Sequence, residues 1–335
     1  MKFFKIMFFL LIMIGSLISI SSHTWFGMWL GLEINLLSII PLMNSTNNLT
    51  SSEATLKYFI TQALASTILL FSMIFISYKI PFIWNKNLII LMMNSSLLTK
   101  MGAAPFHFWF PEVMEGLTWL NCLIMLTWQK IAPMILIIYN LNYPKFFSII
   151  ILISMLVSGI MGLNQISLRK ILTYSSINHI AWMLAAMFFN EMVWFWYFLI
   201  YTFMTINIIL IFHIFKMFFI KQLTMKLNFN VMFKLFFSMN FLSLGGLPPF
   251  IGFFPKWITI QGLIMKNFYI LAMMMILMTL MTLFYYIRLI SSMILMSINE
   301  LNYQINFNYN YPWVMISNYI NILSLIFCTI LFNFI

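Results

Sequence analysis

The chain has 335 residues, of which 63% are hydrophobic and 7% are charged, and its mean hydropathy is +1.01. So few charged side chains cannot cover the surface of a soluble protein of this length, which excludes a soluble globular fold. The formal net charge of +11 is spread along the chain rather than gathered in a dense Lys/Arg run, so nucleic acid is not expected as a partner. The composition predicts an all-α polytopic membrane protein.

Membrane-spanning helices are predicted wherever an apolar run of about 20 residues lies between polar or Pro/Gly residues. In chain order we expect about eleven of them, near residues 3–20, 24–43, 54–78, 86–110, 117–139, 146–163, 167–189, 192–217, 232–262, 268–296 and 313–334. The connections are short, so a single integral membrane domain is expected over residues 1–335.

Two stretches 144 residues apart repeat one pattern: residues 100–112 read KMGAAPFHFWFPE, and residues 244–256 read LGGLPPFIGFFPK. Gly and Pro remove or loosen backbone hydrogen bonds that lipid cannot replace. Both stretches are therefore predicted to be non-helical breaks covered by protein, over residues 102–105 and 245–249. Paired breaks at corresponding places in two halves are typical of the central site of a transporter.

The breaks fall in the fourth and ninth predicted spans, and the odd number of spans between them predicts that the second copy is inverted. We expect two inverted five-helix repeats, residues 1–140 and 141–296, followed by a loop and a closing helix over 297–335. Basic residues near the span ends favour the N-terminal side by about two to one. This bias predicts an N-terminus on the inner side and a C-terminus on the outer side.

Glu33 is the one acidic residue that lies well inside a predicted span. An ionisable group near the middle of a membrane costs about 2.5–3.5 kcal/mol even on the lenient insertion scale, so it needs a partner or a water pathway. Gly27 and Gly31 form a GxxxG pattern on the same helix, which favours the close approach of a second helix. Glu33 is thus either a functional carboxylate or a structural tie between two helices.

Three lysines, Lys100, Lys130 and Lys256, lie in the broken spans or next to them. One Glu cannot neutralise three ammonium groups, so at least one lysine is predicted to exchange its proton or to lie in water. Lysines near a span end can instead extend their head groups to the interface. That alternative is weak for Lys130, which is in mid-span, and stronger for Lys256.

His179 follows an unusually polar stretch, residues 174–178 (YSSIN), and the 144-residue offset maps it to Asn35, two residues past Glu33. A lone histidine in a helix is a packing residue about as often as a proton relay, and both alternatives stay open. The isolated Cys122 and Cys328, and the lack of a nucleotide-binding glycine pattern, give no reason to expect a metal or cofactor in this chain.

Four strings in this order, LLTKMGAAPFHFWFPEVMEGL, LTWQKIAP, LRKILTYSSINHIAWM and GGLPPFIGFFPKW, resemble the proton-translocating antiporter-like family of respiratory complex I. The likeness covers nearly the whole chain, and the Met-, Ile-, Phe- and Asn-rich composition is similar to that of invertebrate mitochondrial proteins. It implies a multi-pass subunit of the mitochondrial inner membrane with its N-terminus in the matrix. The implied partners are neighbouring antiporter-like subunits, other membrane-arm and accessory subunits, and phospholipids.

The resemblance also implies roles for four residues. Glu33 matches the family's carboxylate, Lys100 the lysine that pairs with it, Lys130 the central lysine and Lys256 the terminal lysine. Charge movements along these residues would couple quinone reduction, carried out elsewhere in the complex, to proton transport, with His179 as a further relay. A stand-alone cation/proton antiporter and a passive scaffold subunit are the two alternatives.

Overall fold

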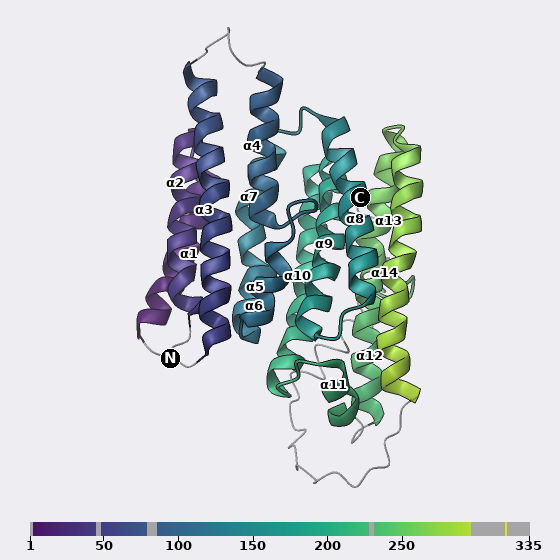
Figure 1. The fold of residues 1–335 in the computed structure, drawn as a ribbon. Coiled ribbons are helices and arrows are strands. Elements are labelled where there is room, and N and C mark those ends of the chain that lie inside the picture. The colour runs from purple at the N-terminus through teal and green to yellow at the C-terminus, as the bar shows by residue number, and fades with distance from the viewer. Residues whose placement is uncertain (1–2, 45–47, 79–85, 228–230, 296–318, 320–335) are drawn as a thin grey trace. The chain divides into compact units, whose positions relative to one another are not determined.

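The computed structural model describes residues 3–44, 48–78, 86–227, 231–295 and 319. Fourteen α-helices occupy most of these residues, and the only β-bridge among them joins Ser167 to Phe219 (Figure 1). The predicted all-helical class is confirmed. The chain divides into two compact units, Met1–Ile150 and Ile151–Ile335. The predicted closing helix at 313–334 lies, apart from residue 319, outside the described residues.

The first unit is a bundle in which long apolar helices pack side by side. Its helices are α1 (Phe3–Ser21), α2 (Trp25–Met43), α3 (Leu49–Tyr78), α4 (Lys86–Met101), α5 (Trp109–Gly116), α6 (Trp119–Leu126), α7 (Trp128–Ile138) and the start of α8 (Pro144–Leu163). The close approach between α1 and α2 occurs at Gly31, where an added Cβ would lie 2.5 Å from the backbone nitrogen of Ser19. Gly27, the other member of the predicted GxxxG pattern, faces only the preceding turn at Ser22 and Thr24.

The second unit is built around a helix that is buried along nearly its whole length. This helix is α9 (Leu168–Met187), which packs against α10 (Glu191–Ile214), α13 (Phe253–Met265) and α14 (Tyr269–Leu295). The unit also contains the rest of α8, α11 (Ile220–Leu227) and α12 (Val231–Gly245). Full burial explains how a polar helix is accommodated in an apolar bundle, since its hydroxyls and amides contact protein rather than lipid.

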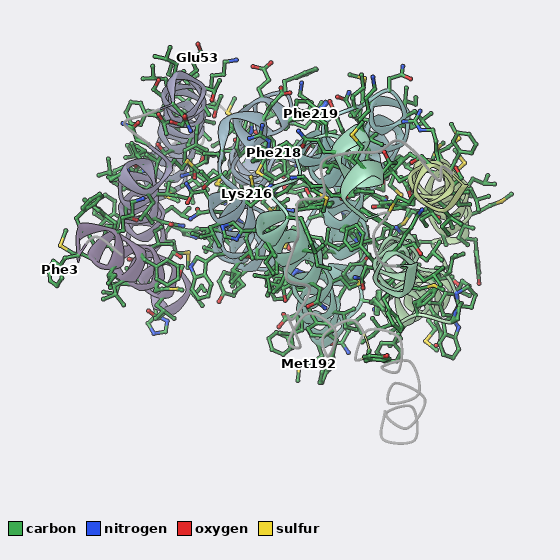
Figure 2. All side chains as sticks on the ribbon, turned by 90° about the horizontal axis from the view of Figure 1, so that it is seen from below. Phe3, Glu53, Met192, Lys216, Phe218 and Phe219 are labelled. Atoms are coloured by element: carbon green, nitrogen blue, oxygen red, sulfur yellow. The ribbon has the colours of Figure 1, made fainter. Side chains whose placement is uncertain are left out.

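The connection after α10 holds a short helix, α11, that the sequence did not predict. The Lys226 Nζ donates to the carbonyl oxygens of Phe215 at 2.6 Å and Lys216 at 3.3 Å, and so caps the end of α10. Burial and the nearby charge of Lys216 lower the pKa of Lys226. Figure 2 looks toward this end of the unit and labels Lys216, Phe218 and Phe219.

Seven helices among the described residues are long and apolar enough to cross a membrane. They are Phe3–Ser21, Trp25–Met43, Leu49–Ser77, Trp119–Ile138, Pro144–Leu163, Glu191–Ile214 and Tyr269–Ile294. The multi-pass character predicted from composition is thereby confirmed. The two spans predicted to be broken are absent from this described set because each consists of two shorter helices.

Both predicted breaks are present, and they begin and end at corresponding residues. The first separates Met101, the end of α4, from Trp109, the start of α5; the second separates Gly245, the end of α12, from Phe253, the start of α13. Each boundary in the second unit is 144 residues after its counterpart in the first (245 − 101 and 253 − 109).

A left-handed glycine ends the first helix of each pair, with φ of 75° at Gly102 and 76° at Gly246. The cover by protein is incomplete, because Pro105, Pro248 and Pro249 are exposed in this chain. For these three residues the prediction of a covered break was wrong. Proline has no backbone N–H to leave unpaired, so its exposure is the least unfavourable in such a break.

The backbone hydrogen bonds within the two breaks also correspond. In each, an N–H two residues past the helix end returns to a carbonyl five residues earlier, and two later N–H groups close tight turns. The pairs are Ala103 to Leu98 and Leu247 to Leu242, Phe106 to Ala103 and Phe250 to Leu247, and Phe110 to His107 and Phe254 to Ile251. Two sequences that differ at most positions therefore form the same local backbone.

A further interruption, which the sequence analysis missed, divides the span 119–138. Thr127 has φ of −112° and ψ of −73° and separates α6 from α7, and its hydroxyl donates to the carbonyl oxygen of Leu123 at 2.7 Å. Pro133 lies inside α7 and has no N–H to donate to the carbonyl of Gln129. Lys130 thus lies on a short helical segment whose hydrogen bonding is weakened on both sides.

Candidate functional site

Lys100 is the penultimate residue of α4, is 7% exposed and faces a small polar cavity of the first unit. The cavity has about 10 Å³ of free volume, which is close to the space that one water molecule requires. Its lining is Leu32, Asn35, Leu36, Tyr58, Gln62, Lys100, Gln129 and Pro133. The side chains of Asn35 and Gln129 form two mutual hydrogen bonds of 3.0 and 2.9 Å and so fix one wall.

Glu33 lies on α2 beside this cavity and is half-buried rather than fully buried. Its charge interacts with the ammonium of Lys100. The interaction acts across a gap, because these two described side chains do not form an ion pair in direct contact, unlike Lys57 and Glu112. The structure thus brings Glu33 and Lys100 into electrostatic range of each other without direct contact.

Lys130 is 1% exposed and lies on α7, directly after the Thr127 interruption. Its Nζ is 5.5 Å from the centre of the Phe110 ring, and Phe110 is the second residue of α5, the helix that follows the first break. A cation over an aromatic face is stabilised by the ring quadrupole. Lys130 does not line the Lys100 cavity, but its neighbour Gln129 does. The expectation that Lys130 is deeply buried is met.

Lys256 is 5% exposed and lies in the first turn of α13, after the second break. Its Nζ donates to the carbonyl oxygen of Gly245 at 2.8 Å, the last residue of α12, and is 5.8 Å from the centre of the Trp182 ring. The ammonium is therefore held by the end of a helix and an indole ring. The predicted alternative, in which Lys256 extends to the interface, disagrees with this burial.

His179 is 1% exposed and lies one helical turn before Trp182 on α9. Its Nδ1 is 2.9 Å from the hydroxyl of Tyr197, and the ring of Tyr201 is 5.0 Å away, centre to centre. His179 and Lys256 thus belong to one region of the second unit, connected through α9. The sequence analysis named neither Trp182 nor the tyrosines, although their polar atoms within apolar spans were a usable signal.

Glu112 is the counterpart of Lys256 under the 144-residue offset, and its surroundings differ. It forms an exposed ion pair with Lys57, with a distance of 2.6 Å from Nζ to Oε2. No group of three or more His, Cys, Asp or Glu side chains that could hold a metal ion occurs within the described residues.

Comparison with known proteins assigns the chain to a family. The family described as NADH:quinone oxidoreductase/Mrp antiporter, transmembrane, matches residues 22–282. The NADH-ubiquinone oxidoreductase chain 2 of Anopheles gambiae is 49% identical over 335 residues, covering 98% of this chain and 93% of the mosquito protein. The chain belongs to this family. Further relatives of the same name are 48% identical in Aedes aegypti and 46% in Locusta migratoria, covering 97% and 88% of this chain and 97% and 87% of their own lengths.

Solved structures of chains from other membrane complexes share the fold. A chain of respiratory complex I from Thermus thermophilus superposes with a TM-score of 0.84 at 22% identity, over 95% of this chain and 75% of that one. A chain of the Mrp complex from Dietzia sp. superposes with a TM-score of 0.74 at 17% identity, over 85% of this chain and 59% of that one. The resemblance inferred from the sequence motifs is confirmed, and the insect relatives agree with the invertebrate composition.

Proposed function

We propose that the chain is a proton-translocating membrane-arm subunit of NADH:ubiquinone oxidoreductase that contains no redox centre of its own. The observation that carries the proposal is the burial of Lys100, Lys130 and Lys256, each beside a break or an interruption in a helix, in a chain with relatives named NADH-ubiquinone oxidoreductase chain 2. Ionisable residues inside membrane helices mark ion and proton pathways.

The proposed architecture is about eleven spans arranged as two inverted five-helix repeats, residues 1–140 and 141–296, with a closing helix beyond them. Its support is the recurrence of helix ends at an offset of 144 residues, both at the breaks and at Met43 and Met187, the ends of α2 and α9 (187 − 43). The basic residues near the span ends favour an N-terminus in the matrix and a C-terminus in the intermembrane space.

The proposed mechanism assigns each buried group to one step of proton movement. Lys100 takes up or releases a proton beside Glu33, whose charge acts on it, with the polar cavity as the local route for water. Lys130 is the central exchange group, and Lys256 is the terminal one, with His179 as a relay in the same unit. Quinone reduction itself takes place in other subunits and is the source of the driving force.

The proposed location is the mitochondrial inner membrane, as the animal relatives suggest. Proposed partners are the neighbouring antiporter-like subunits, accessory subunits and the surrounding phospholipids. Large exposed apolar side chains on several helices, such as Phe3, Met265 and Ile270, agree with a chain covered by lipid and by other subunits.

The central test is Lys130→Met in the assembled complex. Methionine keeps the apolar stem and adapts to irregular packing, and it removes the buried ammonium, so assembly is expected to survive. We expect quinone-linked NADH oxidation and proton transport to fall by about 10²-fold, because general acid–base groups contribute on that order. NADH oxidation with an artificial acceptor should be unchanged, since it bypasses the membrane part.

The matched control is Lys266→Met, which makes the same change at an exposed lysine between α13 and α14. It should leave transport and assembly unchanged. Normal pumping by assembled Lys130→Met complex would favour the scaffold alternative. Proton transport by the isolated chain, without other subunits, would favour a stand-alone antiporter.

A further inference from the structure

Four buried tyrosines surround the polar helix α9 in the second unit. Tyr197 and Tyr201 come from α10, Tyr285 and Tyr286 come from α14, and each is 1% exposed. Phenylalanine would fill the same volume without placing a hydroxyl in an apolar bundle, where an unpaired polar group is costly. The four hydroxyls therefore call for an explanation beyond packing.

The two tyrosines of α10 connect to α9. The Tyr197 hydroxyl lies 2.9 Å from His179 Nδ1, and Tyr201 is hydrogen-bonded to the hydroxyl of Ser176, three residues before His179. A phenol hydroxyl can donate to a ring nitrogen or accept from it, so the contact with Tyr197 is compatible with either tautomer of His179.

The tyrosines of α14 extend the same cluster. Tyr286 interacts with the hydroxyls of Tyr285 and Ser175, and its hydroxyl also interacts electrostatically with those of Tyr197 and Tyr201. In the described part of the chain, the Tyr285 and Tyr286 hydroxyls do not reach full hydrogen-bond geometry.

The cluster adjoins the Lys256 site through the end of α12. A Cβ added to Gly245 would lie 3.6 Å from Cδ2 of the Tyr286 ring, and the carbonyl oxygen of Gly245 accepts the hydrogen bond from Lys256. Lys256 therefore bonds to the last residue of α12, and the Tyr286 ring lies close to that same residue.

We propose that Tyr286 and Tyr197 are proton-relay residues that connect Lys256 with His179. A hydroxyl oxygen accepts a proton from one side as its own proton passes to the next acceptor, so no residue changes its covalent structure and no oxidant or reductant is needed. Water carries the proton where two hydroxyls do not touch. Ser175 and Ser176 position the phenols. This inference rests on the proposed function, and it adds a route inside the second unit.

The test is Tyr286→Phe and, separately, Tyr197→Phe in the assembled complex, since each change removes one oxygen and keeps the ring. We expect proton transport and quinone-linked NADH oxidation to fall at least about tenfold, and the solvent deuterium isotope effect on turnover to rise. The control is Tyr269→Phe, which removes a hydroxyl that is exposed and bonded only to nearby Asn267. It should leave all three quantities unchanged.

The outcomes separate this inference from the proposed function. If Lys130→Met abolishes transport but both tyrosine variants pump normally with an unchanged isotope effect, the relay is overturned and the proposed function stands. If Lys130→Met pumps normally, the proposed function itself fails. Should Tyr286→Phe not assemble, Tyr197→Phe alone decides, because its hydroxyl has the best-defined bond of the cluster.

Discussion

The two broken helices have the same backbone and opposite placements of charge. Both turn at a left-handed glycine, Gly102 or Gly246, and resume a helix after corresponding numbers of residues. In the first unit the buried lysine, Lys100, precedes the break, whereas in the second unit Lys256 follows it. The break is thus a shared scaffold, and the position of the lysine distinguishes the two units.

Other positions that correspond under the 144-residue offset also carry polar side chains with different surroundings. Glu112 is exposed and paired with Lys57, while its counterpart Lys256 is buried and held by a backbone carbonyl. Asn35 is locked in an amide pair, while its counterpart His179 contacts a phenol hydroxyl. Conserving a backbone while exchanging its polar side chains allows two similar units to handle protons differently.

The largest expected difference in proton transport is between the variants Lys256→Met and Glu112→Gln. Lys256→Met removes the buried group proposed as the terminal exchange site, and we expect proton transport to fall by about 10²-fold. Glu112→Gln disrupts an exposed ion pair, which contributes little, so transport should stay within about twofold. Acidification by proteoliposomes, normalised to assembled complex, measures both. Equal losses would remove the distinction between the two positions.

Gly102→Ala and Gly246→Ala should each strain the break that contains the substituted glycine. The effect on proton transport should be larger for Gly246→Ala. Each change places a side chain in the left-handed region, at a cost of about 1–2 kcal/mol. At Gly246 the added Cβ would also lie 2.8 Å from Cδ of Lys256, whereas at Gly102 it would lie 3.1 Å from the Phe110 ring. Gly246→Ala should therefore displace the lysine and reduce transport severalfold.

For Gly102→Ala we expect mainly a lower temperature of half-inactivation of the complex, with less effect on transport. Thermal inactivation and proton transport of both variants give the comparison. A stronger loss of transport in Gly102→Ala than in Gly246→Ala would contradict the contacts described for Lys256.

The smallest expected effect concerns the amide pair of the first unit. Asn35→Leu or Gln129→Leu leaves the partner amide buried and unpaired, which costs about 1–3 kcal/mol, whereas the double variant leaves neither. We expect the double variant to be more heat-resistant than either single variant. A double-mutant cycle on thermal inactivation measures this coupling, and strict additivity would show that the pair is unimportant.

The sequence predicted most of the fold because lipid imposes strong constraints. Apolar runs gave the helices, and repeated Gly and Pro residues located the start of both breaks to within one residue. Each break extends three residues further than predicted, to 108 and 252, and Gly245, which was predicted to be non-helical, is the last residue of α12. The burial of Lys130 was also predictable, since it lies in the middle of an apolar segment. For Lys256 the sequence left open an extension to the interface, and the observed burial disagrees with that alternative. The roles of these lysines in proton transfer stay predictions.

Other features depend on contacts between distant segments, which local patterns do not encode. The interruption at Thr127 is bonded locally, but threonine occurs in many continuous helices, so the residue type alone did not indicate it. The pairing of Asn35 with Gln129 joins residues 94 apart in the chain. Tyr197 and Tyr286 are on different helices, and only the folded unit shows that both approach α9.

The different partners of the two lysines set the net charge that each unit carries. With Glu33 ionised, a proton on Lys100 makes that pair neutral, and its loss leaves one negative charge. Among the described residues no carboxylate pairs with Lys256, which meets only the carboxyl end of α12, equivalent to about half a negative charge, and an indole ring. A proton on Lys256 therefore adds charge to its unit. The state with no net charge at either site therefore has Lys100 protonated and Lys256 unprotonated. Any other distribution of protons over the two lysines leaves a net charge inside the membrane and raises the electrostatic energy.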